Sequence, residues 1–228
     1  MLWFKGLVMM ISFSHGALLT SSLFFQALPM WAVYTGAVLV GLVVGSFLNV
    51  VIYRLPIMLE AQWQGEASPV NLMLPRSHCP QCKTVLRWYQ NIPVVSFLLL
   101  RGRCRACGYS ISPRYPVVEA ITGLLFGVAA WRFGWSIAWF AVCLYISFSV
   151  CLSALDIAHH WLPDDLTQPL LWLGLFFNLY GTFSTLQDAV IGAMAGYGTL
   201  WLLYWVFKLL TKKEGLGRGD FKALGAVG

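Results

Sequence analysis

SIAWFAVCLYISFSVCLSAL, residues 136–155, is an uncharged and mostly apolar stretch, long enough to cross a bilayer as a helix. Comparable runs occupy Trp31 to Tyr53, Val117 to Ala130, Leu166 to Tyr180 and Leu186 to Leu210. The chain is 59% hydrophobic with a mean hydropathy of +0.72, which is more apolar surface than one water-soluble core can bury. The sequence therefore predicts an all-α polytopic membrane protein with about five to six spanning helices.

The apolar runs divide the chain into four regions. We expect residues 1–28 to form an N-terminal extension that resembles a signal segment without a clear cleavage site, or alternatively a further spanning helix. Residues 29–53 are predicted to be the first spanning helix, residues 54–116 a loop domain, and residues 117–228 a second membrane domain.

The basic residues orient the predicted helices. Of the fifteen Lys and Arg, eight lie from Arg54 to Arg114 and five from Lys208 to Lys222. Because short cytoplasmic loops carry the excess of Lys and Arg, both segments are predicted to be cytoplasmic, which places Asp156 and Asp220 at the same membrane face. The net charge of +6 then reports topology and contact with anionic lipid. A nucleic-acid partner is not expected, because no nucleic-acid-binding motif is present.

Two CxxC pairs lie in the loop domain, Cys79 with Cys82 and Cys104 with Cys107, separated by 21 residues. Four thiolates from two tight turns are typical of a tetrahedral zinc site. The sequence therefore predicts a small, cytoplasmic, zinc-ribbon-like domain in which zinc is structural, because four cysteines leave no open position. The alternatives are that the cysteines form a redox or disulfide site, or that they have neither a metal nor a redox function. His78, next to Cys79, is either a substitute metal ligand or an exposed residue without a role in the site.

Asp156 follows the apolar stretch directly, at the end of a helix where the macrodipole disfavours an anion. It is either a functional carboxylate or a solvated end residue. Asp164 and Asp165 follow Pro163, where either carboxylate is predicted to cap the next helix.

Asp220 follows the glycine-rich segment GLGRG, residues 215–219. Glycines at alternate positions disfavour a helix, so we expect an extended or irregular backbone that another chain can approach closely. A phosphate loop is not expected, because the GxxxxGK[ST] pattern is absent and an acid stands where phosphate would bind.

Two carboxylates at one membrane level suggest acid-base chemistry on a peptide bond. Held close together they do not both ionise readily, so one stays protonated and polarises a carbonyl while the other activates water. No HExxH metal site is present, and no Ser or Cys has a convincing base. A zinc-responsive membrane transporter or ion-relay protein that uses the same acids is the alternative from a different class.

The chain from about Gly41 to Lys222 resembles the bacterial prepilin peptidases, also called type IV leader peptidases, which are GxGD membrane aspartyl proteases. The motifs that carry the resemblance are GSFLNVVIYRLP at 45–56, both CxxC pairs, Asn91 to Pro93, Arg114 to Glu119, Asp156 to Thr167, and Gly217 to Asp220. The resemblance implies that Asp156 and Asp220 are the catalytic pair, and that Gly217, Gly219 and Asp164 support the catalytic loop. Signal-peptide peptidases and presenilins share this chemistry, but the CxxC loop argues against them.

The same resemblance implies the substrates and the location. Prepilins of type IV pili and pseudopilins of type II secretion carry short basic leaders, which are cut after a Gly at the cytoplasmic face of the bacterial inner membrane. Many members then methylate the new N-terminus with S-adenosylmethionine, and the loop near Gly102 and Glu119 is implicated by the resemblance alone. From the residues themselves, Gly102 is equally a simple turn, and Glu119 a partner of Arg114.

Members of the family continue through further spanning helices, whereas only Phe221 to Gly228 follow the second motif here. The protease domain, residues 117–228, is therefore expected to be truncated at its C-terminus, with weak or absent proteolysis from this chain alone.

Overall fold

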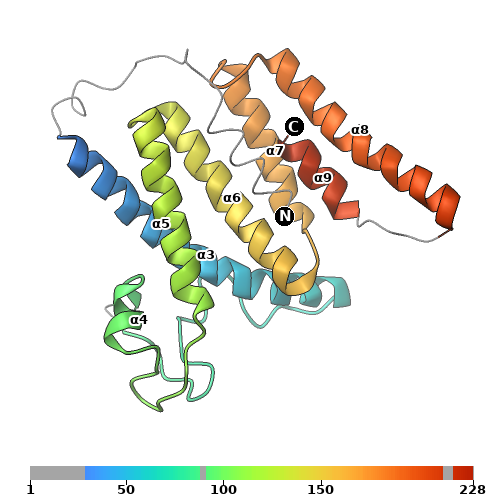
Figure 1. Ribbon diagram of the computed structural model, residues 1–228. Helices are drawn as coiled ribbons and strands as arrows, with labels where there is room; N and C mark the ends of the chain where they lie inside the picture. Colours follow the sequence, from blue (N-terminus) through green and yellow to red (C-terminus); the bar gives the residue numbers. More distant parts are fainter. Residues whose placement is uncertain (1–28, 88–90, 213–217, 228) are drawn as a thin grey trace. The chain divides into compact units, whose positions relative to one another are not determined.

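The computed structural model describes residues 29–87, 91–212 and 218–227, which contain helices, loops and isolated bridges but no sheet (Figure 1). The helices are α3 (Met30–Gln64), α4 (Val95–Leu99), α5 (Arg114–Phe133), α6 (Ile137–His159), α7 (Asp164–Leu179), α8 (Leu186–Thr211) and α9 (Arg218–Val227). Two compact units divide them: an N-terminal unit, Pro29–Trp131, and a C-terminal unit that begins at Arg132. The expectation for residues 1–28 falls outside the described residues.

Four helices, α3, α5, α6 and α8, are long and apolar enough to cross a membrane. The remaining predicted run, Leu166 to Tyr180, corresponds to α7, whose 16 residues make it shorter than these candidates. The prediction of an all-α polytopic membrane protein is confirmed, with four candidate spans among the described residues.

The first helix extends beyond its predicted span. Instead of ending near Tyr53, α3 continues through Pro56 to Gln64, so the segment predicted as a loop from residue 54 begins as helix. Gly65 ends it with a left-handed φ of 72°, a conformation that glycine adopts without steric cost.

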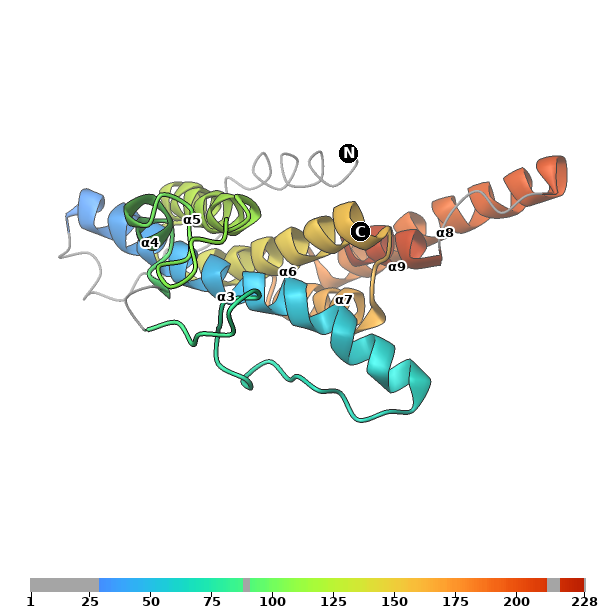
Figure 2. The same ribbon diagram turned by 90° about the horizontal axis from the view of Figure 1, so that it is seen from below.

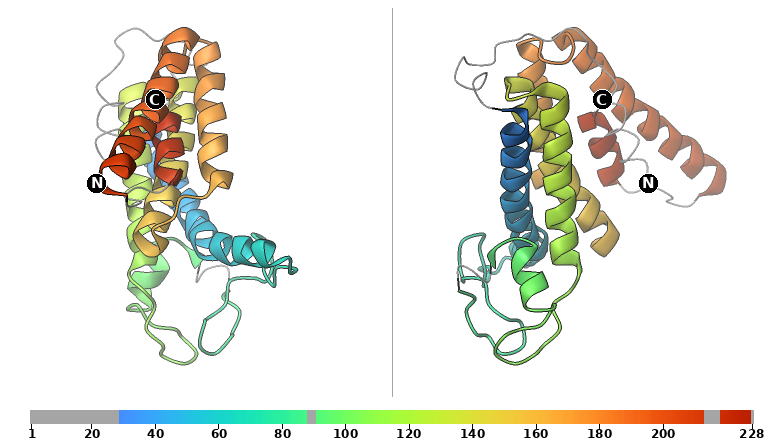
Figure 3. Two further views of the ribbon diagram at one scale, coloured as in Figure 1. Left: turned by 90° about the vertical axis from the view of Figure 1, so that its right-hand side faces the viewer. Right: turned by 60° about the vertical axis from the view of Figure 1, so that its left-hand side comes forward.

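Small residues let α3 and α5 run antiparallel in close contact (Figure 3). A Cβ at Gly41 would lie 2.8 Å from the Cα of Gly123, and one at Gly45 would lie 2.8 Å from the Cα of Glu119. The Asn49 amide also donates to the Tyr115 carbonyl at 3.0 Å, which adds a polar contact between the two helices. The N-terminal unit is therefore held together by close backbone approach, as expected for helices in lipid.

In the C-terminal unit, α9 packs against both α7 and α8 (Figure 2). A buried apolar cluster joins α6, the link to α7, α7 itself and α9; its members are Tyr145, Leu152, Leu162, Leu170 and Ala223. Phe221 of α9 also lies edge-on to Tyr204, the one buried residue of α8. These contacts fix the position of the short helix that carries Asp220.

Candidate functional site

The four cysteines of the loop domain converge on one point. The Sγ atoms of Cys79, Cys82, Cys104 and Cys107 all lie within 4.8 Å of one another. None forms a disulfide, since Cys79 and Cys107 are 3.8 Å apart and Cys82 and Cys104 are 4.0 Å apart at sulfur. The disulfide alternative is therefore not supported, and the arrangement can hold a metal ion.

The two CxxC turns have the same backbone geometry. In each turn the first cysteine donates its N–H to the carbonyl five residues later, at 3.0 Å from Cys79 to Thr84 and 2.8 Å from Cys104 to Tyr109. The residue at the fourth position after that cysteine has a positive φ, 57° at Lys83 and 72° at Gly108. Each turn therefore presents two thiols to the same centre.

The sulfur geometry fits zinc. A tetrahedral ion with Zn–S bonds of about 2.3 Å places its ligands about 3.8 Å apart. The 3.8 and 4.0 Å separations across the two turns are close to that value. His78 is not needed to complete the set, and its Nδ1 lies 2.9 Å from the Arg76 carbonyl.

The thiols differ in acidity. Hydrogen bonds with the side chain and backbone of Thr84 lower the pKa of Cys82 to about 6. Backbone N–H groups of Cys107 and Ala106 lower the pKa of Cys104. The backbone of Tyr109 acts to lower the pKa of Cys107, but desolvation and the neighbouring thiols raise it to about 12. Cys107 therefore needs a nearby cation to reach the thiolate form at neutral pH.

Arg54 attaches this domain to α3. Its guanidinium is buried and donates to the Asn71 carbonyl at 2.7 Å and to the Pro75 carbonyl at 2.6 Å. In the sequence, Arg54 contributes only to the count of basic residues that predicts membrane orientation. Nothing in the local pattern indicates that it binds these distant carbonyls.

Glu119 and Gly102 have identifiable structural roles. The buried Glu119 carboxylate accepts the Val94 N–H at 2.7 Å, and among the described residues it makes no ion pair with Arg114. The suggested pairing with Arg114 was therefore wrong. Gly102 has φ +68°, and a Cβ there would lie 3.0 Å from the Phe97 ring, in agreement with the turn interpretation.

Asp156 lies in the last turn of α6, at the end of the apolar helix as predicted, and its side chain is half-buried. Its carbonyl accepts the His160 N–H at 2.8 Å, where the chain leaves the helix with a left-handed φ of 52° at His160. Cys143 and Cys151 are buried in the same helix.

The predicted capping by Asp164 or Asp165 is wrong. The cap residue of α7 is Pro163, without a side-chain cap, and both carboxylates lie inside the first turn. Pro163 favours this arrangement because its fixed φ suits a helix start, and the acids there still complement the helix dipole.

The backbone at Asp220 also differs from the prediction. Gly219 and Asp220 lie in the first turn of α9 rather than in an extended segment, while Gly215 and Gly217 fall outside the described residues. A Cβ at Gly219 would lie 3.0 Å from the Leu162 Cβ and 3.1 Å from its carbonyl oxygen. The glycine therefore permits a close approach, as expected, but between a helix and the α6–α7 link.

The two segments that carry Asp156 and Asp220, called the acidic motifs below, come into contact at one end of the C-terminal unit. Gly219, next to Asp220, contacts Leu162 of the link that follows Asp156. Lys222 bonds both carboxylate oxygens of Asp164, at 2.6 and 2.7 Å. In the sequence, Lys222 contributes only to the count of basic residues that predicts membrane orientation. Its ion pair with Asp164 could not be predicted, because the two residues are 58 positions apart.

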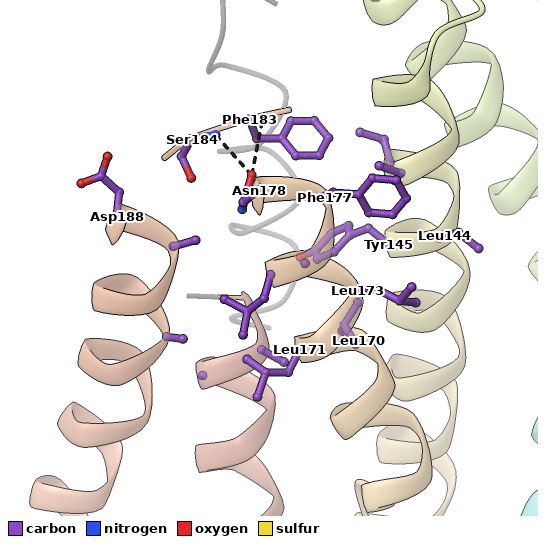
Figure 4. Close-up of a pocket in the computed structure, with 18 residues that line it drawn as sticks. Leu144, Tyr145, Leu170, Leu171, Leu173, Phe177, Asn178, Phe183, Ser184 and Asp188 are labelled. Carbon is purple, nitrogen blue, oxygen red and sulfur yellow. Dashed lines mark hydrogen bonds between the residues drawn. The ribbon is translucent and has the colours of Figure 1, made fainter. Parts of the chain in front are cut away.

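The C-terminal unit also contains a cavity of about 280 Å³ between α6, α7, α8 and α9 (Figure 4). It is lined mainly by apolar side chains, with Asn178, Ser184 and Asp188 among its polar lining residues. The Asn178 side-chain oxygen accepts the N–H groups of Phe183 and Ser184. Neither Asp156 nor Asp220 lines this cavity, so it is separate from the acidic motifs.

Comparison with known sequences gives matches along most of the chain. Residues 39–133 match the bacterial peptidase A24 N-terminal domain, and residues 143–228 match the type IV leader peptidase family. No solved structure matches the chain.

Several curated relatives carry the name prepilin leader peptidase/N-methyltransferase. The protein from Neisseria gonorrhoeae is 50% identical over 216 residues, covering 89% of this chain and 75% of the relative. The protein from Pectobacterium carotovorum subsp. carotovorum is 51% identical, covering 90% and 77% respectively. The protein from Aeromonas hydrophila is 51% identical, covering 87% and 73%.

Proposed function

The chain belongs to the type IV leader peptidase family, and on that premise we propose that it is a prepilin peptidase. It removes the short basic leader from type IV prepilins or type II secretion pseudopilins at the cytoplasmic face of the bacterial inner membrane. The comparisons do not support the transporter alternative.

The observation that carries the proposal is the meeting of the two acidic motifs. The first turn of α9, which contains Asp220, contacts the link that leaves the helix of Asp156. Two carboxylates from separate helices at one end of a helical unit suit a shared-proton acid pair.

In the proposed reaction, the protonated carboxyl group donates a hydrogen bond to the scissile carbonyl, and the ionised carboxylate takes a proton from water. The water oxygen adds to the carbonyl carbon, giving a tetrahedral intermediate. The C–N bond then breaks as the amide nitrogen takes a proton from the pair, which releases the leader acid and the new amine. We assign these roles to Asp156 and Asp220 jointly, with Gly217, Gly219 and Asp164 as supports.

The loop domain is proposed to be a structural zinc site. Cys79, Cys82, Cys104 and Cys107 would hold the ion, and the fit of their sulfur separations supports zinc over a redox role. When bound, the ion would supply folding free energy to the loop domain.

A methyltransferase activity is proposed on the names of the relatives, and S-adenosylmethionine as the methyl donor for the new N-terminus is proposed on the family resemblance alone. No residue of this chain is assigned to the methyl donor.

The test incubates membranes containing the chain with a prepilin and reads the product by mass spectrometry. The proposal expects slow but detectable formation of a pilin that begins at the residue after the leader Gly, in keeping with the weak proteolysis expected above, with one added methyl group when S-adenosylmethionine is supplied. Cleavage elsewhere, or an intact leader together with ion flux in proteoliposomes, would contradict it. A correctly cut but unmethylated product would contradict only the proposed methyltransferase activity.

A further inference from the structure

The ion pair between Lys222 and Asp164 joins two segments that are distant in sequence. Lys222 Nζ lies 2.7 Å from one Asp164 carboxylate oxygen and 2.6 Å from the other. Asp164 begins α7, directly after the link from Asp156, and Lys222 follows Asp220 by two residues on α9. The pair therefore spans the two acidic motifs.

A second contact acts on the same side of α9. Gly219 and Lys222 are three positions apart, so they lie on one face of the helix. Gly219 packs against Leu162 of the link, while Lys222 binds Asp164, two residues further along the chain at the start of α7. Together these contacts fix both the rotation of α9 and its distance from the link.

The opposite contact comes from α8. Phe221 is buried and lies edge-on to Tyr204 and Tyr197, with ring centroids 5.5 and 6.2 Å apart. Asp220 lies between Gly219 and Phe221 in sequence, so its direction depends on contacts on both sides of α9.

The stability of the helices does not account for Lys222. A cation in the N-terminal half of α9 is on the unfavourable side of the helix dipole. Lys222 and Asp164 are also 38% and 56% exposed at their side chains. An ion pair this exposed adds little to the free energy of unfolding. The contacts that the ion pair makes between α7 and α9 therefore point to a role in the geometry of α9 and not in overall stability.

We propose that Lys222 is a positioning residue, whose ion pair with Asp164 sets the rotation of α9 and so aims Asp220 toward Asp156. This inference rests on the proposed function and deepens it. Asp164 acts in the reaction through Lys222 and not by contact with the substrate.

The test uses the whole chain in membranes with Lys222→Met, Asp164→Asn, Lys222→Arg and the exchange of both residues. Asp188→Asn is the matched control, because Asp188 is also a first-turn carboxylate, hydrogen-bonded to Thr185 at 2.7 Å. Two assays are used: the kinetics of leader removal, which give kcat and KM, and hydrogen exchange of the amides in residues 218–227. The double variant in which Lys222 and Asp164 are swapped is compared by hydrogen exchange only. The swap places a new carboxylate close to Asp220, so its cleavage kinetics are not compared.

The Met and Asn variants are expected to lower kcat by about 10- to 100-fold with little change in KM, since small misplacements have effects of this size. Their α9 amides should exchange faster than in the wild type. Lys222→Arg should keep kcat and the slow hydrogen exchange of α9 close to the wild-type values. The variant with Lys222 and Asp164 swapped should also show slow hydrogen exchange, and Asp188→Asn should match the wild type.

Unchanged α9 exchange in the Met variant would overturn the positioning role, and so would a rise in KM alone, which would assign Lys222 to substrate binding. An uncut prepilin with the wild-type chain would count against the proposed function instead. In that case the exchange data still decide whether the pair positions α9.

Discussion

Gly219 lies in the first turn of α9, where the absence of a Cβ lets the helix approach the backbone of Leu162. Its glycine was predicted to give an extended backbone, yet it lies in a helical turn against the Leu162 backbone. Helix propensity is weak beside tertiary packing, so composition alone did not predict this outcome. The close approach itself was predicted, because only a residue without Cβ leaves that space.

Gly219→Ala is expected to displace α9, because the added Cβ would lie 3.1 Å from the Leu162 carbonyl oxygen, a backbone atom that does not rotate away. Overpacking of this kind costs about 1–3 kcal/mol. Leader removal should fall by at least about tenfold, as expected for a misplaced catalytic group.

Gly198→Ala is the control, because nothing lies within 4 Å of its Cβ position in α8. Cleavage by this variant should equal that of the wild type. Equal cleavage by both variants would show that the contact at Gly219 does not affect the site.

The thiol cluster predicts a metal content that depends on single cysteines and on pH. The purified chain should contain one zinc ion, as measured by metal mass spectrometry. The Cys104→Ser variant should contain none. The Cys151→Ser variant, in which the change is buried in α6, should keep its zinc. Protons compete with the metal for the thiolates, so the affinity for zinc should fall as the pH falls, and Cys82, with a pKa of about 6, adds a further competing proton below that pH. Zinc retained by Cys104→Ser would argue against the four-cysteine site.

At the scale of elements, long apolar runs predicted helices well and the segments beyond them poorly. α5 and α8 contain their predicted runs, and α6 contains its run except Ser136, which caps the helix. The extension of α3 to Gln64 was missed, because Arg54 was interpreted as the start of a loop although it is buried against two carbonyls. Non-local hydrogen bonds of this kind leave no periodic pattern in the sequence.

Gly45→Leu should separate α3 from α5. Its Cβ would lie 2.8 Å from the Cα of Glu119, so the two helices must move apart. The variant is expected to unfold at a lower temperature in detergent, by an amount equivalent to about 1–3 kcal/mol. Gly174→Ala in α7, where the Cβ position is open, should unfold like the wild type. The same midpoint for both variants would contradict the tight packing of α3 on α5.

For the whole molecule, the apolar composition correctly predicted a membrane protein, and the motifs correctly predicted the family. The orientation in the membrane stays a prediction from the basic residues. A charge count gives orientation only indirectly, so labelling from each side is needed.

An amine reagent that does not cross membranes tests this orientation, because Lys83 and Lys212 are exposed and lie in predicted cytoplasmic segments. Both should be modified in inside-out vesicles and protected in right-side-out vesicles, as read by peptide mass spectrometry. A lysine introduced as Ser184→Lys, in the connection between α7 and α8, should show the reverse. Labelling of Lys83 and the introduced lysine from the same side would contradict the predicted topology.

The central claim is that Asp156 and Asp220 act as one catalytic pair. The most direct measurement is the initial rate of leader removal from a prepilin by membranes with wild-type chain, Asp156→Asn, Asp220→Asn or the double variant. Each single variant should lose about three orders of magnitude or more, and the double variant should be no slower, because residues that act as a unit are not additive. Asp188→Asn should retain the wild-type rate. Substantial cleavage by either single variant would contradict the account.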